Sequence, residues 1–315
     1  ATVLPTIVTG RFRTLADADQ VIEDGIADMV GMTRAHIADP DIVVKTTSGR
    51  ADEVRTCLGC NQGCLGGFSL GRLACTVNAD VGFENERGGA YDRVAVARAV
   101  LVVGGGPAGL EAARVAALRG HRVVLCEAAG ELGGNMRWSR LFPGRAGIGD
   151  SVDWLVAAIG RLGVEVRLDT RVDDATIGSM SPDVVVVATG GQPAPGEEAL
   201  TSIDIARMDA PPAGVSRVLL VDRFGSYEVL GVAEKFVQWG VDVEVVTPFK
   251  TLAPKVISEQ VITPALERIG THEGRFVARC GWDADASLPG ADAVIVIDRT
   301  PLIGVASNSI FGGEL

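Results

Sequence analysis

A single glycine-rich turn restricts the fold of this chain more than any other feature of its 315 residues. The turn has the sequence GGGPAG at 104–109, which matches the pattern G-x-G-x-x-G, and it follows the apolar run AVLVV at 99–103. After the turn we expect a helix rich in Ala, Leu and Val, and then a strand that ends at Glu127. Strand, glycine turn, helix and strand in this order, with an acidic residue at the end, are what a dinucleotide-binding fold requires.

Each part of this turn has a physical reason. Glycines permit the tight bend and let the backbone approach a pyrophosphate, while the amino terminus of the helix faces the phosphates. A carboxylate at the end of the second strand accepts hydrogen bonds from ribose hydroxyls. A glycine turn with a purely structural role is the alternative. The residues predicted to bind the nucleotide here are Gly104, Gly106, Ala108, Gly109 and Glu127.

Four of the six cysteines lie within a short irregular stretch that is rich in glycine, with the spacing C-x2-C-x3-C-x10-C. Four thiolates that converge in this way are typical of a 4Fe–4S cluster. Zinc is the first alternative, although four-cysteine zinc sites usually have two C-x2-C pairs, and unligated structural thiols are the second. The predicted metal ligands are Cys57, Cys60, Cys64 and Cys75. The other two cysteines, Cys126 and Cys280, are expected to be buried apolar residues.

The first 50 residues alternate between strand and helix signals in the order β-α-β-α, which is the pattern of a parallel α/β structure. Two such units cannot cover both faces of a parallel sheet, so this segment is expected to belong to a larger domain. Gly10 and Arg11 follow the first predicted strand, and Thr33 and Arg34 follow the second. Backbone amides and an arginine fork at strand ends suit a phosphate dianion, although exposed arginines there are more often solvated or paired with acids.

A second strand–helix–strand unit, at 217–247, lacks the glycine pattern. Asp222 and Arg223 stand where the first unit has glycines, and Gly225 and Gly231 are out of register. A bulky side chain at this point blocks the approach of a pyrophosphate, and a carboxylate repels it. We therefore predict that NAD(P)H binding at this unit is degraded or lost.

Composition sets the broad class of the protein. There are 29 basic and 40 acidic residues, which gives a net charge of −11 and argues against binding to nucleic acid. The hydrophobic share of 47% supports a sizeable core. No targeting segment and no apolar run long enough to span a membrane is apparent, so a soluble cytoplasmic protein is expected.

Taken in order, these motifs resemble the trimethylamine dehydrogenase/2,4-dienoyl-CoA reductase family, whose members are similar to old yellow enzyme. The segments that carry the resemblance are CLGCNQGC at 57–64, GGGPAGLEAA at 104–113, GELGG at 130–134 and ATG at 188–190. The resemblance covers about residues 3–300. It implies an α/β fold made of the C-terminal end of a (β/α)8 barrel, an iron–sulfur loop, and Rossmann-like FAD/NAD(P)-type nucleotide-binding domains. The corresponding ranges are 1–50, 51–92, 93–200 and 201–315, the last with the degraded glycine motif.

The family implies FMN in the barrel, a 4Fe–4S cluster beside it, and FAD, or ADP in its place, in the following domain. Under this resemblance the residues that hold the FMN phosphate are Gly10, Arg11, Thr33 and Arg34. The cluster ligands are the four cysteines already named. The nucleotide contacts include, in addition, Gly133, Gly134, Ala188, Thr189 and Gly190.

The degraded second unit places the chain nearer to the amine dehydrogenase branch than to the NADPH-using reductases. In that branch, electrons pass from an amine through FMN and the cluster to an electron-transferring flavoprotein. One alternative is an NAD(P)H-dependent 2,4-dienoyl-CoA or enoate reductase, and another is a non-catalytic electron-transfer subunit. Only two βα units of the barrel are present, so the substrate-binding part is expected in a partner chain or a longer polypeptide. No catalytic residue is assigned, and an oligomer is expected.

Overall fold

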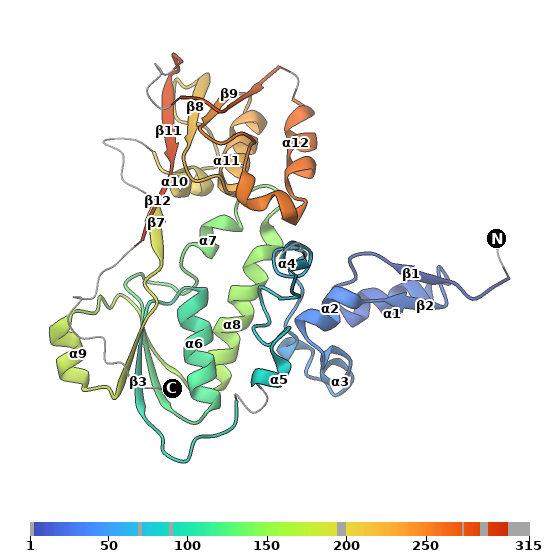
Figure 1. Ribbon diagram of the computed structural model, residues 1–315, viewed down its shortest axis with the longest axis vertical. Coiled ribbons are helices and arrows are strands. Elements are labelled where there is room, and N and C mark those ends of the chain that lie inside the picture. The colour runs from blue at the N-terminus through green and yellow to red at the C-terminus, as the bar shows by residue number, and fades with distance from the viewer. Residues whose placement is uncertain are drawn as a thin grey trace. The chain divides into compact units, whose positions relative to one another are not determined.

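The computed structural model describes residues 3–68, 71–87, 91–193, 200–272, 274–283 and 289–301. The chain forms two compact units, Ala1–Ala90 and Tyr91–Leu315, and Figure 1 labels most of their elements. Both units contain parallel β-sheet and α-helix, so the predicted α/β class is confirmed. The barrel end, the Rossmann-like domains and the four predicted domain ranges stay predictions.

The first unit is built around two short parallel strands, β1 (Ile7–Thr9) and β2 (Met29–Gly31). Helix α1 (Leu15–Glu23) connects them, and its first turn is fixed by a capping box between Thr14 and Asp17. A small core contains Ala18, Met32, Ala35 and Ile42. The remaining elements are α2 (Thr33–Ala38), α3 (Ile42–Thr47), η1 (Ala51–Glu53), α4 (Leu65–Phe68) and α5 (Glu84–Arg87).

Asp28 ties the start of β1 to the start of β2. Its carboxylate accepts hydrogen bonds from the Thr6 amide at 2.7 Å and from the Thr6 hydroxyl at 3.1 Å. These bonds, the one from the amide first, hold the pKa of Asp28 below its usual value. A carboxyl group whose pKa is lowered on folding stabilises the fold above its unfolded pKa and ceases to do so as the pH falls through its folded pKa.

We therefore expect the Thr6 amide to be fully protected against hydrogen exchange above the ordinary aspartate pKa of about 3.9. Its protection factor should fall at lower pH as Asp28 takes up a proton. Asp28→Asn should remove this pH dependence, whereas Asp24→Asn, at the exposed end of α1, should leave it unchanged. Equal pH dependence in the wild type and in Asp28→Asn would contradict this assignment.

The second unit contains two four-stranded parallel sheets, and the strand order of the first is β5-β4-β3-β6. Helices α6 (Pro107–Leu118) and α8 (Asp150–Arg161) cover one face of this sheet, and α9 (Asp174–Met180) covers the other (Figure 1). Cys126 is buried beside α9, as expected. The other elements are β3 (Ala99–Val103), β4 (Arg122–Cys126), α7 (Met136–Ser139), η2 (Ala146–Gly149), β5 (Glu165–Arg167) and β6 (Val184–Val187).

The second sheet has the order β10-β9-β8-β11, and helices α11 (Tyr227–Gln238) and α12 (Ile262–Gly270) contribute to the core on one of its faces. Cys280 lies on β10, which is an edge strand, and it is exposed, so the expectation that it is buried is wrong. The other elements are β7 (Gly191–Pro193), α10 (Ser202–Arg207), β8 (Arg217–Asp222), β9 (Asp242–Thr247), η3 (Pro254–Glu259), β10 (Phe276–Cys280), β11 (Ala293–Ile297) and β12 (Arg299–Pro301). Strands β7 and β12 form a separate antiparallel pair.

The segment 142–145 packs the part of the second unit that contains the first sheet (91–193) against the part that contains the second sheet (200–301). It follows the first glycine turns in sequence, yet Phe142 is only 6% exposed and packs in the core of the second sheet. A Cβ on Gly231 of α11 would lie 2.6 Å from the Phe142 ring. The missing side chain of Gly231 therefore leaves a notch in the surface of α11, and the Phe142 ring packs into it. The Tyr227 hydroxyl donates to the Pro143 carbonyl at 3.2 Å, and the Arg145 guanidinium lies over the Tyr227 ring.

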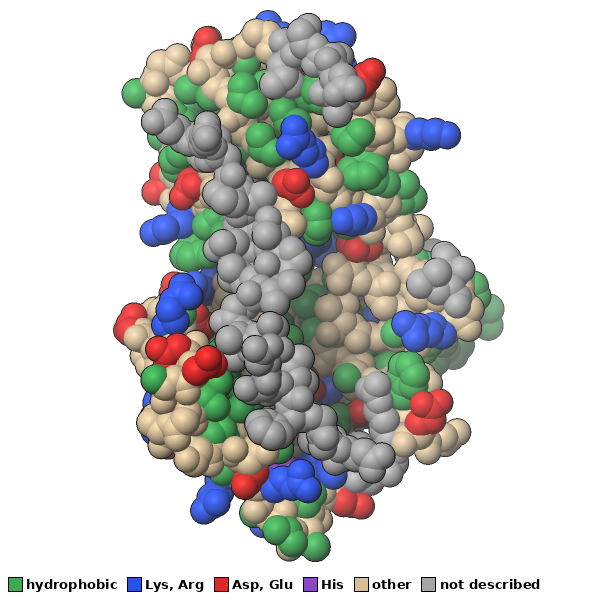
Figure 2. Space-filling view, turned by 60° about the vertical axis from the view of Figure 1, so that its left-hand side comes forward, with side chains coloured by type: hydrophobic (Ala, Val, Ile, Leu, Met, Phe, Trp, Pro, Cys, Tyr) green, Lys and Arg blue, Asp and Glu red, His purple; other side chains and the backbone are tan. Residues whose placement is uncertain are grey.

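The helices and the charged side chains can be compared with the expectations from composition. No helix in the described ranges combines the length and the apolar character that crossing a bilayer needs. On the face shown in Figure 2, Lys and Arg side chains are scattered among Asp and Glu side chains.

Candidate cofactor-binding sites

The glycine turn after β3 leaves no room for a side chain at Gly104 or Gly109. Gly104 has a φ of +108°, and a Cβ there would lie 2.4 Å from the Ala188 carbonyl oxygen. A Cβ on Gly109 would lie 1.9 Å from the Gly104 carbonyl oxygen. Helix α6 follows with Gly106 at its N-cap and no side-chain cap, so its first amides are left for an anion. The turn is therefore a cradle of bare backbone, as a pyrophosphate site requires.

Glu127 follows β4 and binds the turn itself. Its carboxylate accepts hydrogen bonds from the amide of Gly105 at 2.6 Å and from the amide of Ala129 at 2.8 Å. Each carboxylate oxygen has a further lone pair, which can accept a bond from a ribose hydroxyl. The prediction that Glu127 binds ribose stays a prediction, and the structure adds that this residue fixes the shape of the turn.

The GELGG segment lies against the same turn. The amide of Gly133 donates to the Gly105 carbonyl at 2.8 Å. A Cβ on Gly134 would lie 3.0 Å from the Gly106 Cα. Gly133 and Gly134 both have positive φ values, +114° and +52°, so this close crossing of two backbones depends on glycine.

The ATG turn completes the group at the carboxyl end of β6. The amide of Ala188 donates to the Val103 carbonyl at 2.8 Å, and Gly190 turns the chain with a φ of +71°. Asn135 directly follows the GELGG segment, and its side-chain amide donates to the carbonyl of Gly191, the residue after the ATG turn, at 2.5 Å. No spacing rule in the sequence points to this residue. The three predicted segments thus meet at the carboxyl ends of the strands, where open α/β sheets bind their ligands.

The corresponding turn after β8 is closed by protein. Asp222 stands at the strand end with no exposed surface, and its Oδ1 accepts the amides of Phe224 at 3.1 Å and Gly225 at 2.8 Å. Burial raises the pKa of this carboxyl group. A Cβ on Gly225 would lie 2.8 Å from the Phe249 ring and 3.0 Å from Pro254, so these two side chains fill the space beside the turn.

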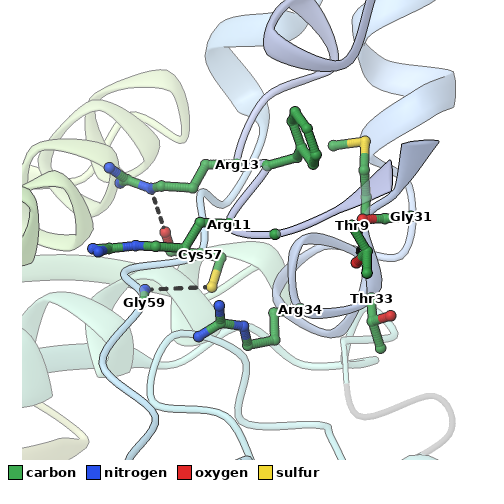
Figure 3. A pocket seen from close by; sticks show the side chains of 11 residues that line it. Thr9, Arg11, Arg13, Gly31, Thr33, Arg34, Cys57 and Gly59 are labelled. Carbon is green, nitrogen blue, oxygen red and sulfur yellow. Dashed lines mark hydrogen bonds between the residues drawn. The ribbon is translucent and has the colours of Figure 1, made fainter. Parts of the chain in front are cut away.

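In the first unit, the residues that follow β1 and β2 line a pocket of about 260 Å³ (Figure 3). The predicted phosphate residues Gly10, Arg11, Thr33 and Arg34 are all part of its lining. Arg11 has a φ of +60°, which is uncommon for a residue other than glycine. Arg34 Nη1 donates to the Asn61 side chain at 2.7 Å. Arg13, to which no motif in the sequence pointed, also lines this pocket, and its Nε donates to the Cys57 carbonyl at 2.6 Å.

The four predicted metal ligands, Cys57, Cys60, Cys64 and Cys75, line one cavity. The amide of Gly59 donates to the Cys57 sulfur at 3.4 Å, and the Cys60 sulfur lies 3.4 Å from the Thr76 hydroxyl. Burial raises the pKa of the Cys75 thiol, and charge on Cys60 and Cys57 raises it further. Positive charge in the cavity, such as a metal centre supplies, would reverse this effect and favour the thiolate.

Two glycines bring Cys75 to the other three cysteines. A Cβ on Gly63 would lie 2.6 Å from the backbone of Ala74, and a Cβ on Gly67 would lie 2.7 Å from the Arg72 carbonyl oxygen. The amide of Ala74 in turn donates to the Gly63 carbonyl at 3.1 Å. The loop and the segment before Cys75 therefore touch backbone to backbone.

The chain matches known oxidoreductases over most of its length, and residues 99–143 match the family model described as FAD dependent oxidoreductase. The probable N-methylproline demethylase of Rhizobium meliloti (strain 1021) is 39% identical over 83% of this chain and 39% of its own length. The NADH oxidase of Thermoanaerobacter brockii is 44% identical over 60% of this chain and 29% of its own length. The structure of histamine dehydrogenase from Rhizobium sp. 4-9 matches with a TM-score of 0.83 at 26% identity, over 95% of this chain and 51% of that chain.

The chain is similar to members of the trimethylamine dehydrogenase/2,4-dienoyl-CoA reductase family over most of its length. The resemblance found in the sequence, which is closer to the amine dehydrogenase branch, is thereby confirmed. The chain spans less than half the length of the two curated relatives and about half of the histamine dehydrogenase chain. The family-model match covers the GGGPAG turn, Glu127 and the GELGG segment.

Proposed function

We propose that this chain is the cofactor-bearing part of a flavin-dependent oxidoreductase that dehydrogenates or demethylates a small amine. The observation that carries the proposal is the contrast between the two turns of the second unit. The turn after β3 is a bare backbone cradle, whereas the turn after β8 is closed by Asp222, Phe249 and Pro254. A reductase supplied by NAD(P)H needs a pyrophosphate site at the second turn, and an enzyme that takes electrons from its own substrate does not.

The first turn would hold FAD, or ADP in its place. The cradle fits such a nucleotide because α6 begins without a side-chain cap and a Cβ on its N-cap Gly106 would have no atom nearer than 3.9 Å. The proposed contacts are Gly104, Gly106, Ala108, Gly109, Glu127, Gly133, Gly134, Ala188, Thr189 and Gly190. A bound flavin supplies a ring that takes up and releases electrons. The amides at the start of α6 would bind its phosphates, and Glu127 would orient its ribose.

The four cysteines of the first unit would hold a 4Fe–4S cluster, which supplies single-electron transfer when bound. All four residues line one cavity. The spacing of these cysteines includes one C-x2-C pair, whereas four-cysteine zinc sites usually have two, and this favours a cluster over a zinc ion.

The pocket after β1 and β2 would hold the FMN phosphate. Its lining provides Arg11, Arg13 and Arg34 as cations and contains no carboxylate. Gly10 and Thr33 would contribute backbone amides. The rest of the flavin site and the substrate site are proposed to lie in six further barrel units, supplied by a longer polypeptide or by a partner chain in an oligomer. The proposed external electron acceptor is an electron-transferring flavoprotein.

The alternative is an NAD(P)H-dependent dienoyl-CoA or enoate reductase, and the similarity to NADH oxidase favours it. The amine proposal is preferred because the side chains of Phe249 and Pro254 fill the turn after β8, where an NAD(P)H-dependent reductase would bind the pyrophosphate. Titration of the purified chain with NADPH is expected to show no saturable binding. In the complete enzyme, a secondary or tertiary methylamine should reduce the flavin and NADPH should not. Rapid NADPH oxidation coupled to reduction of an enoyl substrate would overturn the amine proposal.

Cofactor content tests the same proposal directly. We expect about four irons and about four acid-labile sulfides per chain, with a 4Fe–4S signal in the electron paramagnetic resonance (EPR) spectrum after reduction by dithionite. The mass of the nucleotide released on denaturation should be that of FAD or ADP. Stoichiometric zinc without sulfide would contradict the cluster, and a protein without any adenine nucleotide would contradict the assignment of the first turn.

A further inference from the structure

The three residues that follow Cys75 bring hydrogen-bonding groups to the sulfurs of the cysteine cavity. Thr76 lines this cavity, and its hydroxyl oxygen lies 3.4 Å from the Cys60 sulfur. Burial raises the pKa of the Cys75 thiol, and hydrogen bonds from the backbone amides of Val77 and Asn78 oppose this rise. The segment 76–78 therefore contacts the sulfurs of two predicted metal ligands, one through a side chain and the other through the backbone.

The position of this segment is fixed by a buried side chain. Asn78 is 6% exposed, and its Nδ2 donates to the Ile37 carbonyl in α2 at 3.0 Å. Its Oδ1 accepts a hydrogen bond from the Asp80 amide at 3.2 Å. A buried amide group that is bonded on both sides costs free energy to displace, because its polar atoms would lose their partners. The fold itself thus holds Thr76 beside Cys60.

The direction of the hydrogen bond between Thr76 and Cys60 follows from the chemistry of a metal ligand. While Cys60 is a thiol, either group can donate to the other, and the Thr76 hydroxyl also donates to Gln62 Oε1 at 3.3 Å. A cysteine that binds metal is a thiolate and has no hydrogen to donate. A charged sulfur is also a stronger acceptor than a neutral amide oxygen. In the metal-bound protein the Thr76 hydroxyl is therefore the donor, and Cys60 is the acceptor.

We propose that the Thr76 hydroxyl donates a hydrogen bond to the Cys60 thiolate of the bound cluster and thereby raises its reduction potential. This inference rests on the proposed 4Fe–4S cluster. Hydrogen bonds to the sulfurs are among the factors that set the potential of such clusters. Reduction by dithionite adds one electron and makes the sulfurs more negative, so an O–H group that points at one of them stabilises the reduced form more than the oxidised form. Loss of the hydroxyl should lower the potential.

The test is a redox titration of the purified chain with its cluster, followed through the EPR signal of the reduced form. Thr76→Val replaces the hydroxyl with a methyl group of similar size. It should shift the one-electron equilibrium about threefold towards the oxidised form, which is about 28 mV at about 59 mV per tenfold change. Thr76→Ser keeps the hydroxyl and should have a potential near that of the wild type. Thr47→Val is the matched control, because Thr47 is an exposed threonine of the same unit whose hydroxyl donates to the Val43 carbonyl within α3, and its potential should equal that of the wild type.

The outcomes separate this inference from the proposed function. A wild-type chain without iron and sulfide would refute the cluster itself. A full iron content in Thr76→Val with an unchanged potential would refute only the role of Thr76, as would an equal fall in potential for Thr76→Ser or for Thr47→Val. If Thr76→Val fails to retain iron, Thr76→Ser decides: retained iron with a potential near that of the wild type supports the role of the hydroxyl, and loss of iron in both variants overturns it.

Discussion

Gly109→Val is expected to abolish binding of the adenine nucleotide while most of the fold persists. A Cβ at this position would lie 1.9 Å from the carbonyl oxygen and 3.0 Å from the carbonyl carbon of Gly104, and 3.3 Å from the Ala188 Cβ. The nearest of these atoms belong to the backbone and cannot rotate away, so either the turn or the start of α6 must move. Either movement closes the cradle. We expect the nucleotide content to fall at least about tenfold, which is about 1.4 kcal/mol of binding free energy, and the fold to lose about 1–3 kcal/mol from overpacking.

Gly160→Ala provides the matched control for this variant. Gly160 lies in helix α8, which covers the first sheet together with α6. No atom lies within 4 Å of the point that its Cβ would occupy. Alanine is favoured over glycine within a helix by about 1 kcal/mol, so this variant should bind the nucleotide normally and unfold at a slightly higher urea concentration. Released nucleotide, quantified by mass, gives the comparison. Normal nucleotide content in Gly109→Val would refute the role of the turn after β3.

The parts of the site that follow from spacing could be predicted from the sequence. A glycine turn between a strand and a helix can adopt few conformations, so the pattern G-x-G-x-x-G identified a backbone cradle that the structure contains at 104–109. The cysteine spacing likewise predicted four thiols around one cavity. In both cases the local chain determines the geometry, because the residues that matter are close together in sequence.

The parts that depend on distant contacts could not be predicted in this way. Arg13 and Asn135 each donate a hydrogen bond to a backbone carbonyl far along the chain, and such bonds leave no pattern in composition or periodicity. The sequence also showed that Gly225 and Gly231 are out of register without showing their use. The structure explains both as packing glycines, one beside Phe249 and the other beneath Phe142.

The burial of Cys280 could not be predicted from the sequence either. An apolar run predicts a strand, but whether its side chains are covered depends on the position of that strand in the sheet. The strand order makes β10 an edge, and the side chains from 277 to 280 are exposed there.

Phe142→Ala is expected to destabilise the second unit by about 3–5 kcal/mol, the usual range for removing a buried phenylalanine. Phe142 is 6% exposed and packs into the core of the second sheet, although it belongs to the segment that follows the nucleotide turns. Its removal therefore leaves a cavity and also weakens the connection between the two halves of the unit. Leu141→Ala is the control from the same segment, because Leu141 is 46% exposed and should cost less than 1 kcal/mol, as surface substitutions generally do.

A double-mutant cycle with Gly231 makes this prediction specific to the notch. In the wild type, Gly231→Ala places a Cβ 2.6 Å from the Phe142 ring and should destabilise the unit by about 1–3 kcal/mol through overpacking. In the Phe142→Ala background the ring is gone, so the same alanine should become neutral or stabilising, because alanine is a better helix residue than glycine. Urea unfolding of the four proteins measures the coupling between the two positions. Additive effects would mean that Phe142 does not occupy the notch at Gly231, and that the two halves of the unit are held together by other contacts.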